Sequence, residues 1–282
     1  MTTPTPTFRI GGDIEVRRLG FGAMRLPTEP ADARARSITL ARRAVELGVT
    51  LIDTAYMYGW GANEELLAEA LHPYPADLLV TTKVGPALSP AGEWGLDGRP
   101  AALRAQVDNA LRRLRVDRIE LLQLHRLDPD TPLPDQIGAL RDLRAEGKVG
   151  HIGLSEVTVA ELDEARSIVD IAGVQNRYNV LDRREHEPLL KACEAAGIAF
   201  LPWRPLAPGA ADANPDITAV ATELNATPTQ VALAWLLAHS PMILPIPGTA
   251  TLAHLEENVA AANLTLTPAQ LARLDRLDEA AH

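Results

Sequence analysis

Cysteine is almost absent from this sequence, and Cys193 is the only one. A single thiol cannot form an internal disulfide, which excludes a disulfide-stabilised secreted domain and fits a reducing compartment. Cys193 follows Ala192 in an apolar helical stretch, so we expect a buried thiol rather than a nucleophile. These features predict a cytoplasmic protein.

Long apolar runs and an excess of positive charge are also lacking. No segment approaches the roughly 18 uninterrupted apolar residues of a membrane-spanning helix. Residues 1–7 have neither the cationic start nor the apolar centre of a signal peptide. The chain has 27 Lys and Arg against 37 Asp and Glu, a formal net charge of −10. We therefore expect no membrane partner and no nucleic-acid partner, because no basic stripe is present to neutralise phosphates.

The Gly-x-Gly-x-x-Gly fingerprint of a doubly wound dinucleotide-binding sheet is missing as well. The 282 residues instead alternate between short apolar runs and helical segments, with no linker long enough to divide them. A Gly-rich turn near residues 11–13 predicts an N-terminal β-hairpin. Eight core strands are then expected, each followed by a helix, at residues 19–24, 51–53, 78–83, 119–125, 149–155, 174–179, 198–203 and 242–248. This pattern predicts an α/β fold, a (β/α)8 TIM barrel that forms one domain over residues 1–282.

Ionisable side chains stand at the C-terminal ends of three expected strands. Asp53, Lys83 and His125 occupy these ends, and Tyr58 follows Asp53 in a loop. Taken one at a time, the aspartate could simply cap a turn, the lysine could lie on the surface, the histidine could belong to the core, and the tyrosine could be an ordinary loop residue. Together they lie on the rim where parallel barrels carry their chemistry. The set indicates an acid–base site in which an ammonium lowers the pKa of a proton-donating tyrosine, with no metal required.

Several short motifs follow one another along the chain. They are Leu19-Gly20-Phe21-Gly22, Ile52-Asp53-Thr54-Ala55 with Tyr58-Gly59, Thr82-Lys83, Leu124-His125, Gly150-His151-Ile152-Gly153-Leu154-Ser155, Gln175-Asn176-Arg177-Tyr178-Asn179, Pro247-Gly248-Thr249 and Glu257-Asn258. In this order the chain resembles the aldo-keto reductases nearly end to end, and within them the bacterial branch that includes pyridoxal reductases. The resemblance implies NAD(P)H-dependent reduction of an aldehyde or ketone to an alcohol.

The resemblance also implies a role for each of the four rim residues. Tyr58 protonates the carbonyl oxygen, and Lys83 lowers the pKa of that phenol. Asp53 holds Lys83 in place. His125 donates a hydrogen bond to the carbonyl oxygen and shares in proton transfer.

A nicotinamide cofactor follows from the same resemblance, with NADPH preferred to NADH. The implied contacts are Gly22, Ala23, Met24, Asp53, Ser155, Gln175, Trp203, Arg204, Leu206, Gly209, Gly248, Thr249, His254, Glu257 and Asn258. Ser155 and Gln175 would bind the carboxamide, and Trp203 would stack on the ring. The chain departs from the family where Ser155 is followed by Glu156 instead of asparagine. It departs again where Gly248 and His254 replace a lysine and an arginine near the 2′-phosphate.

The expected substrate is a small carbonyl compound. Arg25, Trp60, Trp94 and Arg126 fall on the rim loops, and aromatic walls suit a flat or apolar molecule. Pyridoxal is one candidate among aldehydes, ketones and keto-sugars. Two other functions stay open: a barrel aldolase that forms a Schiff base on Lys83, and a nicotinamide-binding redox-sensing subunit with slow turnover. We expect a monomer or a small homo-oligomer.

Overall fold

A curled parallel sheet forms the centre of the structure, a computed structural model that describes residues 7–89, 91–206 and 209–278. Its seven strands lie in the order β11-β10-β9-β8-β5-β4-β3, and each neighbouring pair is parallel. The strands are β3 (Phe21–Gly22), β4 (Leu51–Asp53), β5 (Leu79–Val84), β8 (Ile119–Leu124), β9 (Val149–Ser155), β10 (Ile171–Gln175) and β11 (Ala199–Phe200).

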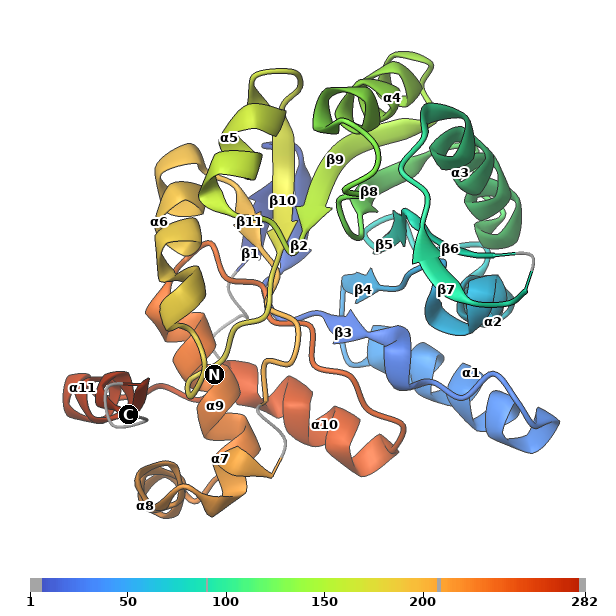
Figure 1. Cartoon of the computed structure of the whole chain (residues 1–282). Coiled ribbons are helices and arrows are strands. Elements are labelled where there is room, and N and C mark those ends of the chain that lie inside the picture. The colour runs from blue at the N-terminus through green and yellow to red at the C-terminus, as the bar shows by residue number, and fades with distance from the viewer. Residues whose placement is uncertain (1–6, 90, 207–208, 279–282) are drawn as a thin grey trace.

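Helices pack around the outer side of this sheet (Figure 1). Thr158, Thr227 and Thr267 each begin a helix with a capping box, so local sequence sets where these helices start. The helices are α1 (Ala31–Glu46), α2 (Ala62–Leu71), α3 (Pro100–Leu114), α4 (Leu133–Ala145), α5 (Val159–Arg166), α6 (Glu187–Ala196), α7 (Ala210–Ala213), α8 (Pro215–Leu224), α9 (Pro228–His239), α10 (Leu252–Ala260) and α11 (Pro268–Asp275).

The eighth expected strand, residues 242–248, is an extended segment without a regular ladder. It nevertheless bonds to both edges of the sheet. The Leu244 N–H donates to the carbonyl of Phe200 at 2.8 Å, and the Gly20 N–H donates to the carbonyl of Pro245 at 2.9 Å. Prolines in this segment have no N–H to donate, which interrupts the ladder. Seven regular strands and this segment together give the arrangement expected of a (β/α)8 barrel.

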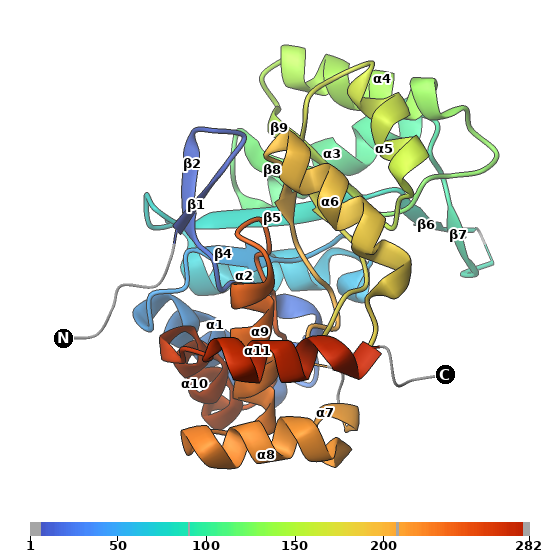
Figure 2. The ribbon, with the colours of Figure 1, turned by 90° about the vertical axis from the view of Figure 1, so that its left-hand side faces the viewer.

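The predicted hairpin closes the N-terminal end of the barrel. It consists of β1 (Thr7–Ile10) and β2 (Ile14–Arg17), paired antiparallel. Figure 2 shows this hairpin at one end of β5 and the β6–β7 hairpin at the other. Ile10 and Val16 of the first hairpin are buried in an apolar cluster that also includes Leu51, Leu79, Leu121, Leu201 and Leu244.

Two sequence-based expectations are wrong in detail. The Gly- and Pro-rich composition of residues 85–100 predicts a long irregular loop, but this stretch contains a short hairpin, β6 (Pro86–Leu88) with β7 (Trp94–Leu96). The strand expected at 174–179 is β10, which begins and ends earlier. Beyond it the side-chain amide of Asn176 bonds the backbone of Val157, and the pairing continues as an isolated bridge between Arg177 and Trp203.

Candidate active site

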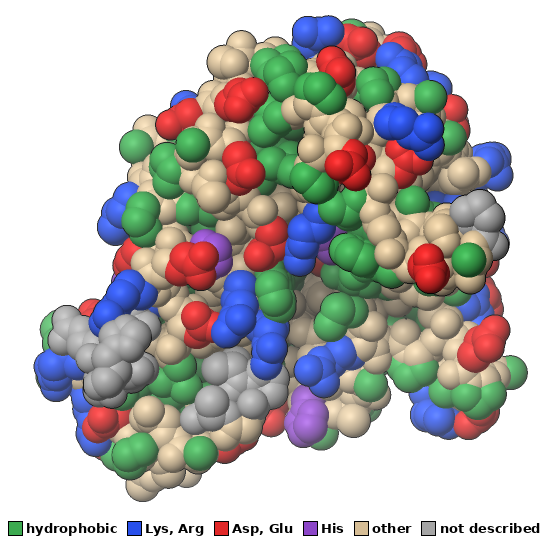
Figure 3. All heavy atoms as spheres, in the orientation of Figure 1, with side chains coloured by type: hydrophobic (Ala, Val, Ile, Leu, Met, Phe, Trp, Pro, Cys, Tyr) green, Lys and Arg blue, Asp and Glu red, His purple; other side chains and the backbone are tan. Residues whose placement is uncertain are grey.

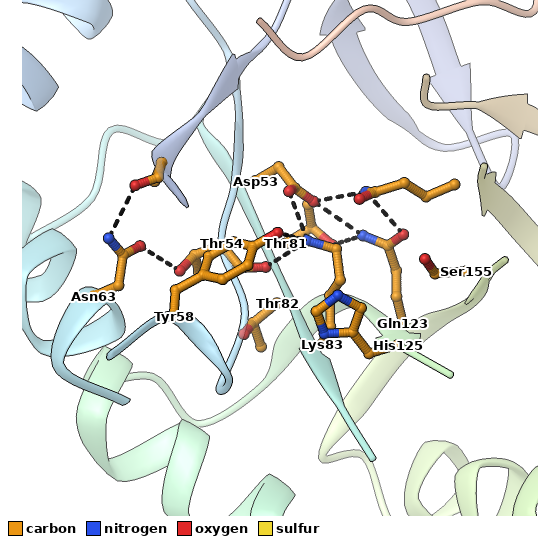
Figure 4. A network of polar contacts seen from close by, with 12 residues as sticks. Asp53, Thr54, Tyr58, Asn63, Thr81, Thr82, Lys83, Gln123, His125 and Ser155 are labelled. Carbon is orange, nitrogen blue, oxygen red and sulfur yellow. Dashed lines mark hydrogen bonds and ion pairs between the residues drawn. The ribbon is translucent and has the colours of Figure 1, made fainter. Parts of the chain in front are cut away.

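Three of the four predicted residues form one hydrogen-bonded group at the C-terminal end of the barrel (Figure 4). Asp53 ends β4, Lys83 stands next to the end of β5, and Tyr58 begins the 3-10 turn η2 (Tyr58–Gly61). The Lys83 Nζ atom lies 2.6 Å from Asp53 Oδ2, 2.9 Å from the carbonyl oxygen of Thr54 and 3.3 Å from the Tyr58 hydroxyl. The ammonium thus links the carboxylate directly to the phenol.

Two glutamines support Asp53 from inside the barrel: Gln123, which the sequence reasoning missed, and Gln175, for which it expected another role. The amide nitrogens of Gln123 and Gln175 donate to Asp53 Oδ1 at 3.2 and 2.9 Å. The Gln123 amide also donates to the Thr81 hydroxyl at 3.0 Å. Gln123 interrupts the apolar Leu121–Leu124 run of β8, and this is a signal that could have pointed to it. Gln175, expected to bind the carboxamide, uses its amide nitrogen on Asp53 and on Gln123.

The loop that carries Tyr58 is held from its outer side by a second buried ion pair. Arg113 Nε lies 2.6 Å from Glu64 Oε2, and the Thr82 hydroxyl donates to Glu64 Oε1 at 2.6 Å. The Arg113 guanidinium also lies 5.0 Å from the ring centroid of Tyr56, in the same loop. The pair therefore ties α2, α3 and β5 to the loop. A separate surface depression of about 370 Å³ adjoins Arg113 outside the barrel.

Burial and charge act in opposite directions on the Lys83–Tyr58 pair. Burial lowers the pKa of Lys83, but the adjacent Asp53 carboxylate and the Tyr58 hydroxyl together more than offset this, and the pKa stands above its usual value. Burial raises the pKa of Tyr58, and the opposing effect of Lys83 is smaller. The expectation of a lowered tyrosine pKa is therefore wrong for this pocket. Tyr58 is a neutral phenol that holds its proton, and Lys83 is an ammonium, which is not the free amine that a Schiff base requires.

His125 lies beside Tyr58, with the two rings edge to face and their centroids 6.0 Å apart. Burial, with lesser effects of Lys83 and Arg126, lowers the pKa of His125 to about 2, so the imidazole is neutral. The share in proton transfer expected of His125 would therefore begin from the neutral imidazole. No described residue hydrogen-bonds its buried Nδ1 atom. An unpaired buried N–H is rarer than an unpaired acceptor, so we assign the proton to Nε2.

Ser155, expected to bind the carboxamide, and Trp203, expected to stack on the ring, lie at the ends of β9 and β11, with β10 between them. Ser155 ends β9 and is buried, and its hydroxyl is 3.2 Å from Arg126 Nη1. Trp203 follows β11, is half-buried, and donates its indole N–H to Glu156 Oε1. The same oxygen accepts the backbone N–H of Arg177 at 2.9 Å. Glu156 was noted in the sequence only as a departure from the family, and its link to Trp203 could not be read from spacing.

Gly22 and Gly248 serve the packing of the barrel. A Cβ atom on Gly22 would lie 2.7 Å from the carbonyl oxygen of Ile246, and one on Gly248 would lie 2.8 Å from the carbonyl oxygen of Gly22. These glycines let β3 and the last extended segment approach each other. Beyond Gly248 the Thr249 hydroxyl accepts the N–H of Thr251 at 3.1 Å, which shapes the loop before α10.

The remaining residues expected to contact the cofactor fall after β3, between β11 and α7, and on α10. Glu257 on α10 accepts the Thr227 hydroxyl, and its neighbour Asn258 is buried. Leu206 is half-buried, whereas Gly209 is exposed just before α7. Exposed residues after β3, after β11 and on α10 complete the set: Met24, Arg204 and His254, with Ala23 buried beside Met24.

The expected substrate residues lie on the rim loops. Trp60 packs edge-on against Tyr56, with ring centroids 5.5 Å apart. Trp94 on β7 is 58% exposed, yet its indole nitrogen lies 3.3 Å from Met57 Sδ. The β6–β7 hairpin therefore reaches the loop of Tyr58. Figure 3 shows a hollow near the centre of this face with Lys and Arg side chains at its edge. Arg25 and Arg126 follow the ends of β3 and β8.

The described part of the chain has neither a metal-binding cluster nor a membrane-spanning helix. There, no three His, Cys, Asp or Glu side chains gather as they would around a metal ion. None of the described helices is both long enough and apolar enough to span a membrane.

Comparison with known proteins agrees with this geometry. The model of the Aldo/keto reductase family matches residues 18–279. The chain belongs to the aldo/keto reductase family. This reductase is 44% identical over 270 residues to an uncharacterized oxidoreductase of Schizosaccharomyces pombe, covering 94% of this chain and 87% of the relative. It is 40% identical over 279 residues to pyridoxine 4-dehydrogenase of Escherichia coli, covering 95% and 97%.

Solved structures place the reductase in the same fold. An aldo/keto reductase from Klebsiella pneumoniae, in complex with NADP and acetate, aligns with a TM-score of 0.85 and 29% identity, covering 96% of this chain and 94% of that one. The predicted family, the (β/α)8 fold class and the oxidoreductase activity are thereby confirmed. The relatives reported above carry oxidoreductase names, and nothing in them supports an aldolase or a redox-sensing subunit.

Proposed function

We propose that this reductase converts an aldehyde or ketone to an alcohol with NADPH, and that Tyr58 supplies the proton. The observation that carries the proposal is the position of Lys83 Nζ, 2.6 Å from Asp53 and 3.3 Å from the Tyr58 hydroxyl. As the phenol loses its proton to the developing alkoxide, the fixed ammonium stabilises the phenolate that forms. Because burial raises the pKa of Tyr58, the acid is fully protonated before the reaction.

His125 and Asp53 orient this chemistry. A neutral imidazole with its proton on Nε2 donates a hydrogen bond to the carbonyl oxygen and polarises it. Asp53, fixed by Gln123 and Gln175, keeps the Lys83 ammonium in place. Bound NADPH supplies the hydride. The protein's own groups thus hold the proton donor and the carbonyl oxygen at one point.

The residues at the mouth fit NADPH. The half-buried ring of Trp203 and the Ser155 hydroxyl suit the nicotinamide end. Arg204 and His254 are exposed near the phosphate loop that Thr249 begins, where cationic and hydroxyl groups suit phosphate. The structure of a relative that holds NADP, and another relative named for NADP(+), support the choice of NADPH over NADH.

The substrate class follows from the rim. Trp60 and Trp94 offer aromatic walls, and Arg25 and Arg126 add positive charge. A flat aromatic aldehyde with an anionic substituent, pyridoxal included, suits this combination, and a relative is named pyridoxine 4-dehydrogenase. The family match over residues 18–279 supports one catalytic domain. We further propose a cytoplasmic monomer or small homo-oligomer, since the single cysteine fits a reducing compartment.

Replacement of one oxygen atom tests the proposal. Tyr58→Phe removes the proton donor and leaves the ring, so reductase activity should fall by about 10³-fold or more. NADPH affinity, measured by titration calorimetry, should stay within about twofold because the hydroxyl faces the carbonyl. Activity within tenfold of wild type on a panel of aldehydes and ketones would reject the role of Tyr58.

A further inference from the structure

Glu156 occupies an unusual position at the mouth of the barrel. One of its carboxylate oxygens, Oε1, accepts the indole N–H of Trp203 and the backbone N–H of Arg177. The backbone N–H of Glu156 in turn donates to the carbonyl oxygen of Gln175 at 3.0 Å. Glu156 follows β9, Arg177 follows β10 and Trp203 follows β11. A single side chain therefore joins the ends of three neighbouring strands.

The backbone of Glu156 is held in a conformation that non-glycine residues rarely adopt. Its φ is 56°, in the left-handed region, and Arg204, directly after Trp203, has a φ of 53°. Such conformations persist where surrounding contacts determine them. Here the strand end at Ser155 and the two N–H donors fix the carboxylate in one place, half-buried beside the indole.

The position of the Glu156 carboxylate matters because two residues expected to contact the cofactor lie next to it. Ser155, the preceding residue, and Trp203, the hydrogen-bonded partner, are the two groups that the proposed function assigns to the nicotinamide end of the cofactor. A carboxylate fixed between them contributes a negative charge beside that surface. The nicotinamide ring is positively charged when oxidised and neutral when reduced, so a nearby fixed charge distinguishes the two states.

We propose that Glu156 is a specificity-determining residue that strengthens binding of the oxidised nicotinamide relative to the reduced one. It acts in two ways: it orients the Trp203 ring through the indole N–H, and it places its charge beside the bound ring. The inference rests on the proposed function, because it requires a nicotinamide at this mouth. It concerns the balance between the two cofactor forms, and therefore how readily the enzyme runs toward alcohol oxidation.

The test compares dissociation constants of NADP+ and NADPH, measured by titration calorimetry without substrate. Glu156→Gln keeps an oxygen that accepts both N–H groups but removes the charge. We expect NADP+ to bind about fivefold more weakly to this variant, with NADPH within about twofold of wild type. The matched control is Glu164→Gln, an exposed glutamate in the last turn of α5, where the chain returns to the start of β10. It removes the same charge at the opposite end of the strands and should leave the ratio of the two constants unchanged.

Two further measurements separate charge from ring orientation. Trp203→Phe keeps an aromatic face but loses the indole N–H, so it should weaken both nucleotides by a similar factor. In the wild-type protein, raising the salt concentration should reduce the preference for NADP+, because salt screens the charge. This second measurement needs no variant and therefore does not depend on how a variant folds.

The outcomes are distinct. The role of the charge would be overturned if the ratio of the NADP+ and NADPH dissociation constants stays unchanged in Glu156→Gln. It would also be overturned if Trp203→Phe changes that ratio as much as Glu156→Gln does, or if the ratio in wild type does not depend on salt. Wild-type protein that binds neither nucleotide would overturn the proposed function itself, and this inference with it. A lowered preference for NADP+ in Glu156→Gln alone would support the assignment.

Discussion

The two ends of the barrel interior differ in chemistry although the same strands build them. At the end closed by the β1–β2 hairpin, the inward side chains are apolar and include Leu79 of β5 and Leu121 of β8. At the open end the same strands present Lys83 and Gln123. Alternate residues of a strand share one face, so each strand passes from an apolar to a polar or charged side chain within a few residues.

The change along β5 is the clearest case. Leu79, Thr81 and Lys83 lie on one face and run from the closed end to the open end. Leu79 packs in the apolar cluster, and the Thr81 hydroxyl accepts a hydrogen bond from Gln123. Lys83 then reaches Asp53 and Tyr58. The apolar end supplies rigidity and the polar end supplies chemistry, as is usual in barrel enzymes. If this division holds, substitutions at the two ends should have separable effects.

The largest effect is expected from Lys83→Met at the open end. The change removes the ammonium that stabilises the Tyr58 phenolate, so kcat should fall by about 10³-fold or more. It also leaves the Asp53 carboxylate buried without its partner, which should lower the free energy of unfolding by about 3–5 kcal/mol. Steady-state kinetics and urea unfolding measure both losses.

A second substitution serves as the control for Lys83→Met. Asp53→Asn combined with Lys83→Met removes both charges, so part of the lost stability should return while activity stays absent. Activity within tenfold of wild type in either protein would break the assignment of chemistry to the open end.

At the closed end, Ile10→Ala should affect stability alone. Ile10 is fully buried in the interior cluster, and its truncation should cost about 2–4 kcal/mol of unfolding free energy. We expect kcat within about twofold of wild type at a temperature where the variant is folded. Ile14→Ala, at a half-buried position in the same hairpin, is the matched control with a smaller cost. A large fall in kcat for folded Ile10→Ala would mean that the two ends are coupled.

The sequence predicted the reactive residues of the open end better than the hydrogen bonds that hold them in place. Asp53, Lys83 and His125 could be placed because parallel strands bring their C-terminal ends to one rim. The helix after Thr158 could be placed from its capping box. These signals are local, and each depends on the order of residues within one element.

Features that depend on packing between distant segments could not be predicted. The hydrogen bonds of Gln123 and Gln175 to Asp53 join residues 70 and 122 positions apart. The β6–β7 hairpin lies in a Gly- and Pro-rich stretch whose composition favours loops. The direction of the Tyr58 pKa shift depends on how deeply the phenol is buried, which outweighs the charge of Lys83.

The buried imidazole of His125 at the open end should also make the stability of the protein depend on pH. The pKa of His125, about 2 in the folded protein, lies below the value near 6.5 of an unfolded chain. Below pH 6.5 the unfolded chain therefore binds a proton that the folded protein does not, and stability falls with falling pH. Between pH 6.5 and 5 the contribution is about 1.5 kcal/mol. Urea unfolding of wild type and His125→Asn at pH 6.5 and pH 5 isolates this contribution of His125. If both proteins lose the same unfolding free energy between the two pH values, the neutral imidazole is contradicted.

The smallest effect is expected from the one charged contact of the hairpin turn. Asp13 Oδ1 lies 2.7 Å from His151 Nε2, and the aspartate side chain is 69% exposed. Slight burial raises the pKa of Asp13, but the hydrogen bond and electrostatic effect of His151, together with the backbone N–H groups of Asp13 and Ile14, outweigh it, so the net pKa is below its usual value. Solvent screens such a contact, and Asp13→Asn should change the free energy of unfolding by less than about 0.5 kcal/mol at pH 7, without a change in kcat. Thermal unfolding measures this directly. A loss comparable with that of Ile10→Ala would mean that charge, not apolar burial, secures the closed end, and the division between the two ends would no longer hold.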